Sequence, residues 1–277
     1  MKKFELTAES KINIFGKKLF RIKALISFGD VEEGETGGWI EKEENLEQSS
    51  GNAWVYGDAE VYGNAWVYGD AGVSGDARVY GDARVYGNAR VYGNAGVSGN
   101  AEVYGNAWVY GDAGVSGDAE VYGNAGVYGD AGVSGDAEVS GDARVYGNAR
   151  VYGNARVSGN AEVYGNAWVY GDAGVSGDAG VSGDAEVYGN ARVSGNAWVY
   201  GNADYTTIHG FGTQFRTTTF FQCEDKQIRV SCGCFLGTIP EFREQVKNTR
   251  EGKIAEEYLM IADLMEKHFV KEKESGE

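Results

Sequence analysis

A six-residue repeat dominates the sequence and limits its fold more than any other feature. From Gly51 to Tyr200, twenty-five consecutive units have the form Gly-(Asn/Asp)-Ala-x-Val-(Tyr/Ser) without an insertion, and GNADYT at 201–206 closes the series. Alanine and valine are two residues apart, so in an extended strand their side chains point to the same side. The glycine and the Asn or Asp that begin each unit tolerate left-handed backbone angles. Each unit therefore predicts a corner followed by a short strand.

Repeated strands and corners predict a chain that winds around an axis. Three units would form one triangular coil, and each coil would hydrogen-bond in parallel to the previous one at a spacing of about 4.8 Å. Burying one valine contributes about 1.5–3 kcal/mol, and the full set offsets the conformational entropy that a glycine-rich chain loses on folding. A disordered low-complexity tract is a poor alternative, because disorder does not require valine at every sixth position. We therefore expect about eight to nine coils with a core of valine and alanine.

Three stretches resemble known proteins. The repeat is similar to the hexapeptide repeat of left-handed parallel β-helices, and its left-handed winding is implied by that resemblance alone, since crossover connections are generally right-handed. The stretch RIKALISFGDVEEGETGGWIEKEENL (21–46) resembles the N-terminal segment of YdcK-like hexapeptide proteins. The stretch TTTFFQCEDKQIRVSCGCFLGTIPEF (217–242) resembles a C-terminal module of phage and prophage proteins. These resemblances imply a fold and a phage or prophage origin, but no particular activity.

The two ends of the chain predict small modules that differ from the repeat. Residues 1–36 alternate apolar and polar side chains, as in a β-hairpin that caps the solenoid. The left-handed β-helix is expected over residues 37–206, and a β-hairpin followed by helices over residues 207–277. The predicted fold is therefore mainly β: a single-stranded left-handed parallel β-helix with a small N-terminal β cap and a C-terminal α+β module.

Helix signals appear only after the last predicted strand. Thr238-Ile239-Pro240-Glu241 has the pattern of a capped helix start, with Thr at the N-cap, Glu three residues later and Pro in the first turn. Ile254, Tyr258, Ile261 and Met265 recur at helical spacing and should form the buried side of a final helix.

Composition limits the partners and the compartment. The 277 residues include 41 Asp and Glu against 25 Lys and Arg, which gives a formal net charge of -16. That charge repels nucleic acid, and no apolar run has the length of a membrane span or a signal peptide. An odd number of cysteines without an export signal predicts reduced thiols in the cytoplasm, which would be that of a bacterial host if the protein is phage-encoded. We expect no cofactor, and either a protein partner or self-association.

Aromatic side chains are expected to form the main outer surface. If every coil has eighteen residues, taking every third unit gives one face with a column of four tyrosines followed by four serines. Exposed aromatic ladders suit partner binding, although stacking between rungs also stabilises the coil by about 0.5–1.5 kcal/mol per pair. The predicted binding residues are Trp54, Trp66, Trp108, Trp168, Trp198, Tyr68, Tyr86, Tyr104 and Tyr122.

Two other columns on the predicted surface have alternative interpretations. Glu102, Glu120 and Glu138 would lie on adjacent rungs between Arg84 and Arg156, either as a site for a cation or basic peptide or, as we favour, as a solvated face. A second face has three rungs without bulky side chains, which would allow another backbone to approach closely. This predicted interface strip comprises Gly96, Ser98, Gly114, Ser116, Gly132 and Ser134, although chance distribution of small residues explains it equally well.

The repeat offers little support for an enzymatic function. Hexapeptide acyltransferases use a catalytic histidine, and related carbonic anhydrases use three histidines on zinc, whereas this chain has only His209 and His268, both after the repeat. Cys223, Cys232 and Cys234 with His209 could form a metal site, but a single residue between Cys232 and Cys234 is short for structural zinc. We therefore assign no catalytic residue and no metal, and interpret the cysteines as small apolar side chains.

Three functional hypotheses follow, and the first is favoured. It is a non-catalytic binding or scaffold protein that presents the aromatic solenoid to a protein or other ligand, with capture of a host factor in counter-defence as one form. The second is a hexapeptide-type acyltransferase that takes its base, His209, from the C-terminal module. The third is a self-assembling structural protein whose solenoids stack or pair.

Overall fold

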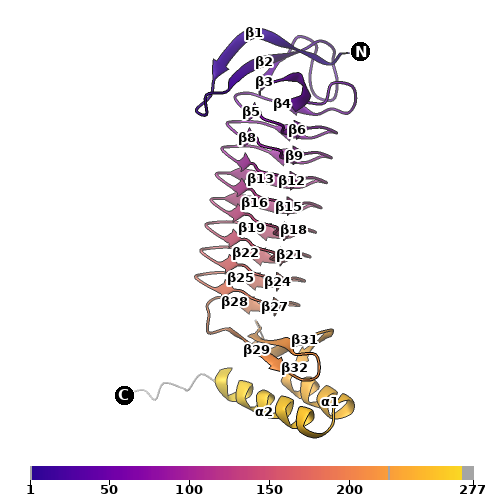
Figure 1. The fold of residues 1–277 in the computed structure, drawn as a ribbon, viewed down its shortest axis with the longest axis vertical. Helices are drawn as coiled ribbons and strands as arrows, with labels where there is room; N and C mark the ends of the chain where they lie inside the picture. Colours follow the sequence, from indigo (N-terminus) through magenta and orange to yellow (C-terminus); the bar gives the residue numbers. More distant parts are fainter. Residues whose placement is uncertain (1, 224, 270–277) are drawn as a thin grey trace, which may run out of the picture.

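The computed structural model describes residues 2–223 and 225–269, so residues 270–277 of the predicted C-terminal module lie outside it. The protein is an elongated parallel β-solenoid with an antiparallel β module at its N-terminal end and an α+β module at its C-terminal end (Figure 1). This confirms the predicted mainly-β solenoid with two terminal modules. Neither described helix has the length and apolar character that a membrane span requires.

Each repeat unit contributes one short strand, and the strands form three sheets along the solenoid. The eleven-stranded sheet contains β1 (Phe4–Ile12), β2 (Lys18–Ala24), β3 (Thr36–Ile40), β5 (Glu60–Val61), β8 (Arg78–Val79), β11 (Gly96–Val97), β14 (Gly114–Val115), β17 (Gly132–Val133), β20 (Arg150–Val151), β23 (Trp168–Val169) and β26 (Glu186–Val187). The nine-stranded sheet contains β4 (Trp54–Val55), β7 (Gly72–Val73), β10 (Arg90–Val91), β13 (Trp108–Gly111), β16 (Gly126–Gly129), β19 (Arg144–Val145), β22 (Glu162–Val163), β25 (Gly180–Val181) and β28 (Trp198–Val199). The eight-stranded sheet contains β6 (Trp66–Val67), β9 (Arg84–Val85), β12 (Glu102–Val103), β15 (Glu120–Val121), β18 (Glu138–Val139), β21 (Arg156–Val157), β24 (Gly174–Val175) and β27 (Arg192–Val193).

The pairing register repeats every eighteen residues, as the sequence predicts. For example, Val97 pairs in parallel with Val115, and Val115 pairs with Val133. Backbone hydrogen bonds join successive coils, such as Ser116 N to Val133 O at 2.9 Å. The valines and alanines of the repeat are fully buried in one continuous core. Burial of this core, rather than strand length, therefore stabilises strands that are mostly two residues long.

The corners of the solenoid need glycine for two separate reasons. Gly117 has a φ of +72°, in the left-handed region. A Cβ atom on Gly117 would also lie 2.9 Å from the backbone N and 3.1 Å from the backbone O of Gly135 in the next coil. Beside the glycines, asparagine side chains donate to the residue one coil later, as Asn100 Nδ2 does to Asp118 Oδ1 at 2.7 Å. The Gly-(Asn/Asp) pair thus closes each corner and links it to the next.

The N-terminal module caps the first coil. β1 and β2 form an antiparallel hairpin, β2 pairs with β3, and β3 then pairs in parallel with β5, so the hairpin extends the eleven-stranded sheet. Ile40 pairs with Val61, and Leu46 bridges to Val67 after the short 3-10 helix η1 (Glu43–Asn45). The valine column therefore begins before the perfect repeat, in one irregular coil.

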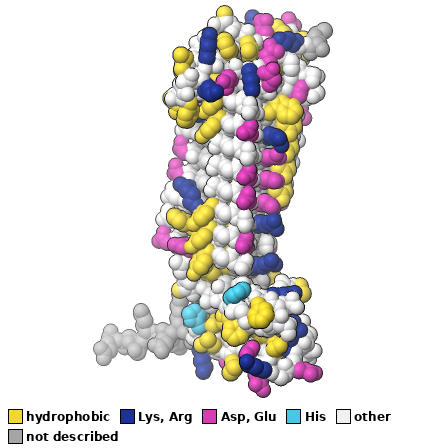
Figure 2. Space-filling view, in the orientation of Figure 1, with side chains coloured by type: hydrophobic (Ala, Val, Ile, Leu, Met, Phe, Trp, Pro, Cys, Tyr) yellow, Lys and Arg dark blue, Asp and Glu magenta, His cyan; other side chains and the backbone are white. Residues whose placement is uncertain are grey.

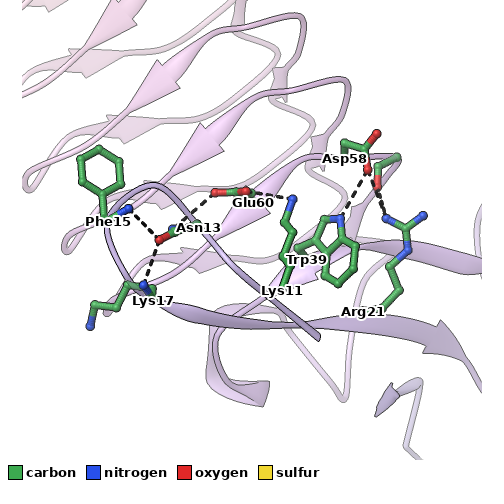
Figure 3. Close-up of polar contacts among 9 residues, drawn as sticks. Lys11, Asn13, Phe15, Lys17, Arg21, Trp39, Asp58 and Glu60 are labelled. Carbon is green, nitrogen blue, oxygen red and sulfur yellow. Dashed lines mark hydrogen bonds and ion pairs between the residues drawn. The ribbon is translucent and has the colours of Figure 1, made fainter. Parts of the chain in front are cut away.

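A polar network holds this cap on the solenoid (Figure 3). Glu60, on the first regular rung of the eleven-stranded sheet, is buried; it pairs with Lys11 Nζ at 2.9 Å and accepts from Asn13 Nδ2 at 3.4 Å. Lys11 also contacts Trp39: its Nζ lies 4.6 Å from the Trp39 ring centroid, and the guanidinium carbon of Arg21 lies 4.7 Å from the same centroid. Because the buried carboxylate is paired and hydrogen-bonded, it fixes the hairpin without leaving an unpaired charge.

The C-terminal module closes the other end with a sheet and two helices. Its antiparallel sheet contains β29 (Tyr205–Phe211), β30 (Arg216–Gln222), β31 (Ile228–Cys232) and β32 (Phe235–Thr238), whereas the sequence predicts only a hairpin here. Two strands are additional. β29 arises because Tyr205 stands in the valine position of the closing unit and the chain there leaves the coil, and β32 arises because the chain turns after Cys232 and pairs back on β31. Tyr205, Phe221 and Cys223 instead complete the solenoid core.

Helices α1 (Ile239–Thr249) and α2 (Gly252–Phe269) cover this C-terminal sheet. The predicted helix start is confirmed: Thr238 is the N-cap and forms a capping box with Glu241. Tyr258, Ile261 and Met265 of α2 are buried, and Ile254 packs partly buried against the same cluster. The second core of the protein therefore lies between this sheet and the two helices.

Candidate functional site

The predicted tyrosine column exists and is closely stacked. Tyr68, Tyr86, Tyr104 and Tyr122 have successive ring centroids 4.7, 4.8 and 4.9 Å apart, and Trp66 adds a fifth ring at 4.1 Å from Tyr68. A second five-ring stack, on the nine-stranded side, comprises Tyr92, Tyr110, Tyr128, Tyr146 and Tyr164. Such stacking accounts for most of the tyrosines as stabilising elements of the coil.

Several of these tyrosines donate hydrogen bonds to glutamates on the following coil. Tyr86 Oη donates to Glu102 Oε2 and Tyr104 Oη to Glu120 Oε2, each at 2.8 Å. Arg84 and Arg156 pair with Glu102 and Glu138 at 2.8 and 3.4 Å. Within the described residues, no group of His, Cys, Asp and Glu is arranged to hold a metal ion. The glutamate column is thus satisfied by protein groups rather than arranged around a cation.

The phenol of Tyr170 gives a pH prediction for this ladder. Burial, together with a hydrogen bond to Glu186, raises the pKa of Tyr170 to about 12. In the unfolded chain the phenol would ionise near its ordinary pKa of 10.0. Since the folded pKa is the higher one, this contribution to stability is constant below pH 10 and is lost as the pH rises toward 12. Alkaline denaturation monitored by circular dichroism should therefore begin above pH 10, less steeply in Tyr170→Phe; ionisation of all phenols near pH 10 in the folded protein would contradict this.

The structure distributes the predicted tryptophans over all three sheets, with Trp54, Trp108 and Trp198 on the nine-stranded sheet. Trp54 is fully buried under the N-terminal module, against Phe4 and Phe28, and so it is not part of the outer surface. Trp66, Trp108 and Trp168 are 39%, 48% and 45% exposed, but they lie in the eight-, nine- and eleven-stranded sheets respectively. The half-buried ring of Trp198 lies against Gly180. No single platform therefore contains all five.

The predicted interface strip is open over two rungs and covered over the third. Cβ atoms added at Gly96 or Gly114 would meet nothing within 4 Å. At Gly132, a Cβ atom would lie 3.1 Å from Cδ of Arg150, which leans across from the next coil. The open part of the strip is therefore shorter than the sequence suggested, because a long side chain fills the space above a glycine neighbour.

Charge is unevenly distributed along the solenoid. Residues 91–143, which we call the acidic belt, contain eight Asp and Glu and no Lys, Arg or His. Figure 2 shows acidic side chains along the middle coils, with basic ones toward both ends. Trp108 lies within this belt, edge-on to Tyr92 at 6.1 Å. The belt therefore combines an exposed indole, which pairs in register with Arg90 on the nine-stranded sheet, with carboxylates that lie on the eight-stranded sheet and at the corners.

A groove at the junction of the solenoid and the C-terminal module was not predicted. One part, of about 700 Å³, lies beside Gly174 and is lined by Arg156, Arg192 and Leu236. A second part, of about 620 Å³, is lined by Arg192, His209 and Arg216 among others. Five residues line both parts: Asn190, Arg192, Ser231, Gly233 and Cys234. We call this combined space the junction groove.

Three elements position the groove side chains. The backbone N–H of Arg192 donates to Thr219 Oγ1 at 3.0 Å, which ties β27 to β30. His209 on β29 lies beside β30, with Nδ1 3.2 Å from Thr217 Oγ1. The guanidinium of Arg216 lies against Gly233, where a larger residue would displace it. Of the groove residues, the sequence analysis named His209 and Cys234 as possible metal ligands and Arg156 beside the glutamate column. Arg192 and Arg216 were not predicted, because they come from segments that meet only after folding.

The cysteines and His209 do not come together as a metal site in the part of the chain that the structure describes. Cys223 is buried in the solenoid core, and this burial raises the pKa of its thiol to about 11. Cys232 accepts a hydrogen bond from Thr218, whereas Cys234 is exposed at the junction groove. The buried Cys223 is therefore a protonated apolar side chain at neutral pH.

Comparison with known proteins supports the repeat assignment. A family model described as the YdcK β-solenoid repeat matches residues 83–99, 137–153, 143–159, 149–165, 155–171 and 185–201. A search among curated proteins gives no match. The repeat region is thus similar to YdcK β-solenoids, while the left-handed winding and the phage origin implied by the other resemblances stay predictions.

Proposed function

We propose that this protein is a non-catalytic binding protein whose capped solenoid presents the acidic belt to a basic protein partner. The observation that carries the proposal is the exposed indole of Trp108 inside a segment with eight carboxylates and no cationic residue. Aromatic side chains are enriched at binding surfaces, and opposite charge steers the approach of a partner. Lysine or arginine on the partner would also gain cation–π contacts with the indole.

The architecture supports a scaffold role for the solenoid. Successive coils are joined at a fixed register and share one continuous core, which keeps the side faces rigid. Rigid surfaces bind with a smaller loss of entropy than surfaces that must be ordered first. If residues 217–242 derive from a phage module, as their resemblance implies, the partner would be a host factor met in the bacterial cytoplasm.

Affinity capture from a bacterial lysate with matched tryptophan variants tests this function. Trp108→Ala and Glu120→Lys should both lose a basic partner that the unmodified protein retains. Trp168→Ala is the control, because Trp168 is similarly exposed and similarly edge-on to a tyrosine, Tyr152, but lies outside the acidic belt. Raised salt should release the partner. Equal loss with Trp168→Ala, or a captured partner that is acidic, would contradict the proposal.

Two other functions have one observation each in their favour. His209 lines the junction groove beside Arg192 and Arg216, so acyl transfer with His209 as base is testable as coenzyme A release that His209→Ala abolishes. The open surface at Gly96 and Gly114 would allow solenoids to pair side by side. Sedimentation velocity should then show oligomers that Gly114→Arg dissociates. End-to-end stacking is disfavoured because terminal modules cover both ends of the solenoid.

A further inference from the structure

The junction groove concentrates positive charge in a protein with a net charge of -16. Arg192 and Arg216 both line its second part, and no Asp or Glu of the described residues lines that part with them. Across residues 2–223 and 225–269, neither arginine has an ion pair with a carboxylate. Their guanidinium groups therefore remain available to an anion from solution.

Neutral hydrogen-bonding groups surround these two arginines. Asn190, Thr217 and Ser231 line the same part of the groove and come from the solenoid, β30 and β31. Guanidinium groups bind phosphate through paired hydrogen bonds, and amide and hydroxyl groups complete such sites. At about 620 Å³, this part of the groove is in the size range of small-molecule sites.

An aromatic ring lies at the edge of the same space. Phe215 also lines it and is 66% exposed. Its φ is +47°, a left-handed conformation that is unfavourable for a residue with a large side chain. Phe215 is the last residue of the turn between β29 and β30, and this turn accounts for its backbone angle. An exposed aromatic ring next to Arg216 offers a stacking surface for a planar ring of a ligand.

We propose that the junction groove binds a nucleotide, with its phosphates held by Arg192 and Arg216 and its base stacked on Phe215. A single nucleotide fits both observations, because it joins an anionic group to a planar aromatic ring. A nucleic acid strand does not suit the protein as well, since its length would expose it to the negative solenoid. This site is separate from the acidic belt, so it does not depend on the proposed protein partner.

Isothermal titration calorimetry of the full chain with adenosine triphosphate, pyrophosphate and adenosine tests the assignment. The triphosphate should bind more tightly than either fragment, because only it engages both the arginines and the ring. Arg192→Gln and Arg216→Gln should each weaken binding by about tenfold or more. Phe215→Asn, which tolerates the left-handed backbone, should reduce the affinity for the triphosphate to that for pyrophosphate.

Arg150→Gln is the matched control, because this arginine lies on the solenoid surface away from the groove and should leave binding unchanged. Circular dichroism of each variant checks that the fold is intact. The proposal is overturned if the triphosphate gives no binding at millimolar concentration, or if Arg150→Gln weakens binding as much as Arg192→Gln. Equal affinity for pyrophosphate and the triphosphate in the unmodified protein would also overturn it, by leaving the ring without a role.

Discussion

Replacing Gly117 by alanine is expected to destabilise the solenoid strongly, whereas replacing Gly114 by alanine, three residues earlier, should not. Alanine at position 117 would have to adopt the left-handed backbone conformation of Gly117, which costs a residue with a Cβ about 1–2 kcal/mol. It would also press on the backbone of Gly135, since the added Cβ would lie 2.9 Å from its N atom and 3.1 Å from its O atom, and overpacking of this kind adds about 1–3 kcal/mol. The free energy of unfolding should therefore fall by about 2–5 kcal/mol.

Gly114 is the internal control because it lies in strand β14, where an added Cβ would meet nothing within 4 Å. Alanine there should leave stability unchanged or raise it by about 0.4–1 kcal/mol, by restricting the unfolded chain. Urea denaturation followed by circular dichroism measures both variants. Similar losses for the two alanines would show that corner geometry does not limit this fold.

The contrast between these glycines explains why the solenoid could be predicted from the sequence. Each unit places glycine where the corner turns and valine where the core lies, so local preference and burial agree at every sixth residue. Because no insertion interrupts the series, counting by eighteen predicted the partners of Val97, Glu102 and Trp108 in the neighbouring coils. The eighteen-residue period therefore predicts the pairing register between coils as well as the architecture.

Contacts between the repeat and the terminal modules could not be predicted from the period. Trp54 has the same position in its unit as Trp108, yet the first is buried and the second exposed, because only the first lies beneath the N-terminal module. The junction groove joins Arg192 of the repeat to Arg216 of β30, and their proximity depends on how the C-terminal sheet meets the last coils. Such contacts follow from tertiary packing, which no repeat unit encodes.

Long side chains that lean over neighbouring glycines also determine which parts of the solenoid surface are open. A long side chain at the x position leans over a glycine on the preceding coil, as Arg90 does over Gly72 and Arg150 over Gly132. Arg150 then donates to the backbone carbonyl of Asp130. A glycine column in the sequence is therefore covered where an arginine of the following rung leans over it, whereas at Gly126 no atom of Arg144 lies within 4 Å of an added Cβ.

Replacing Trp54 by alanine should produce the other large loss of stability and should also change the state of association. Trp54 is fully buried and meets Phe4 and Phe28 edge-on, with ring centroids 6.1 and 5.5 Å away. Truncating a buried tryptophan typically costs about 3–5 kcal/mol. The lost packing is between the N-terminal module and the solenoid, so the hairpin should detach and expose the end of the coil. Exposed strand edges pair with other chains, so sedimentation velocity should show more association for Trp54→Ala than for the unmodified protein.

Two substitutions separate loss of the cap from loss of an indole in general. Trp108→Ala removes an exposed ring and should change stability little, without inducing association. Trp54→Phe should retain much of the stability, because the indole Nε1 of Trp54 has no hydrogen-bond partner among the described residues and its removal breaks no bond. If Trp54→Ala is destabilised but does not associate, the exposed end of the coil does not pair with other chains, and the N-terminal module contributes to stability alone. If Trp54→Ala is as stable as Trp108→Ala, the module is not a cap, since a covered core residue of this size cannot be removed without cost.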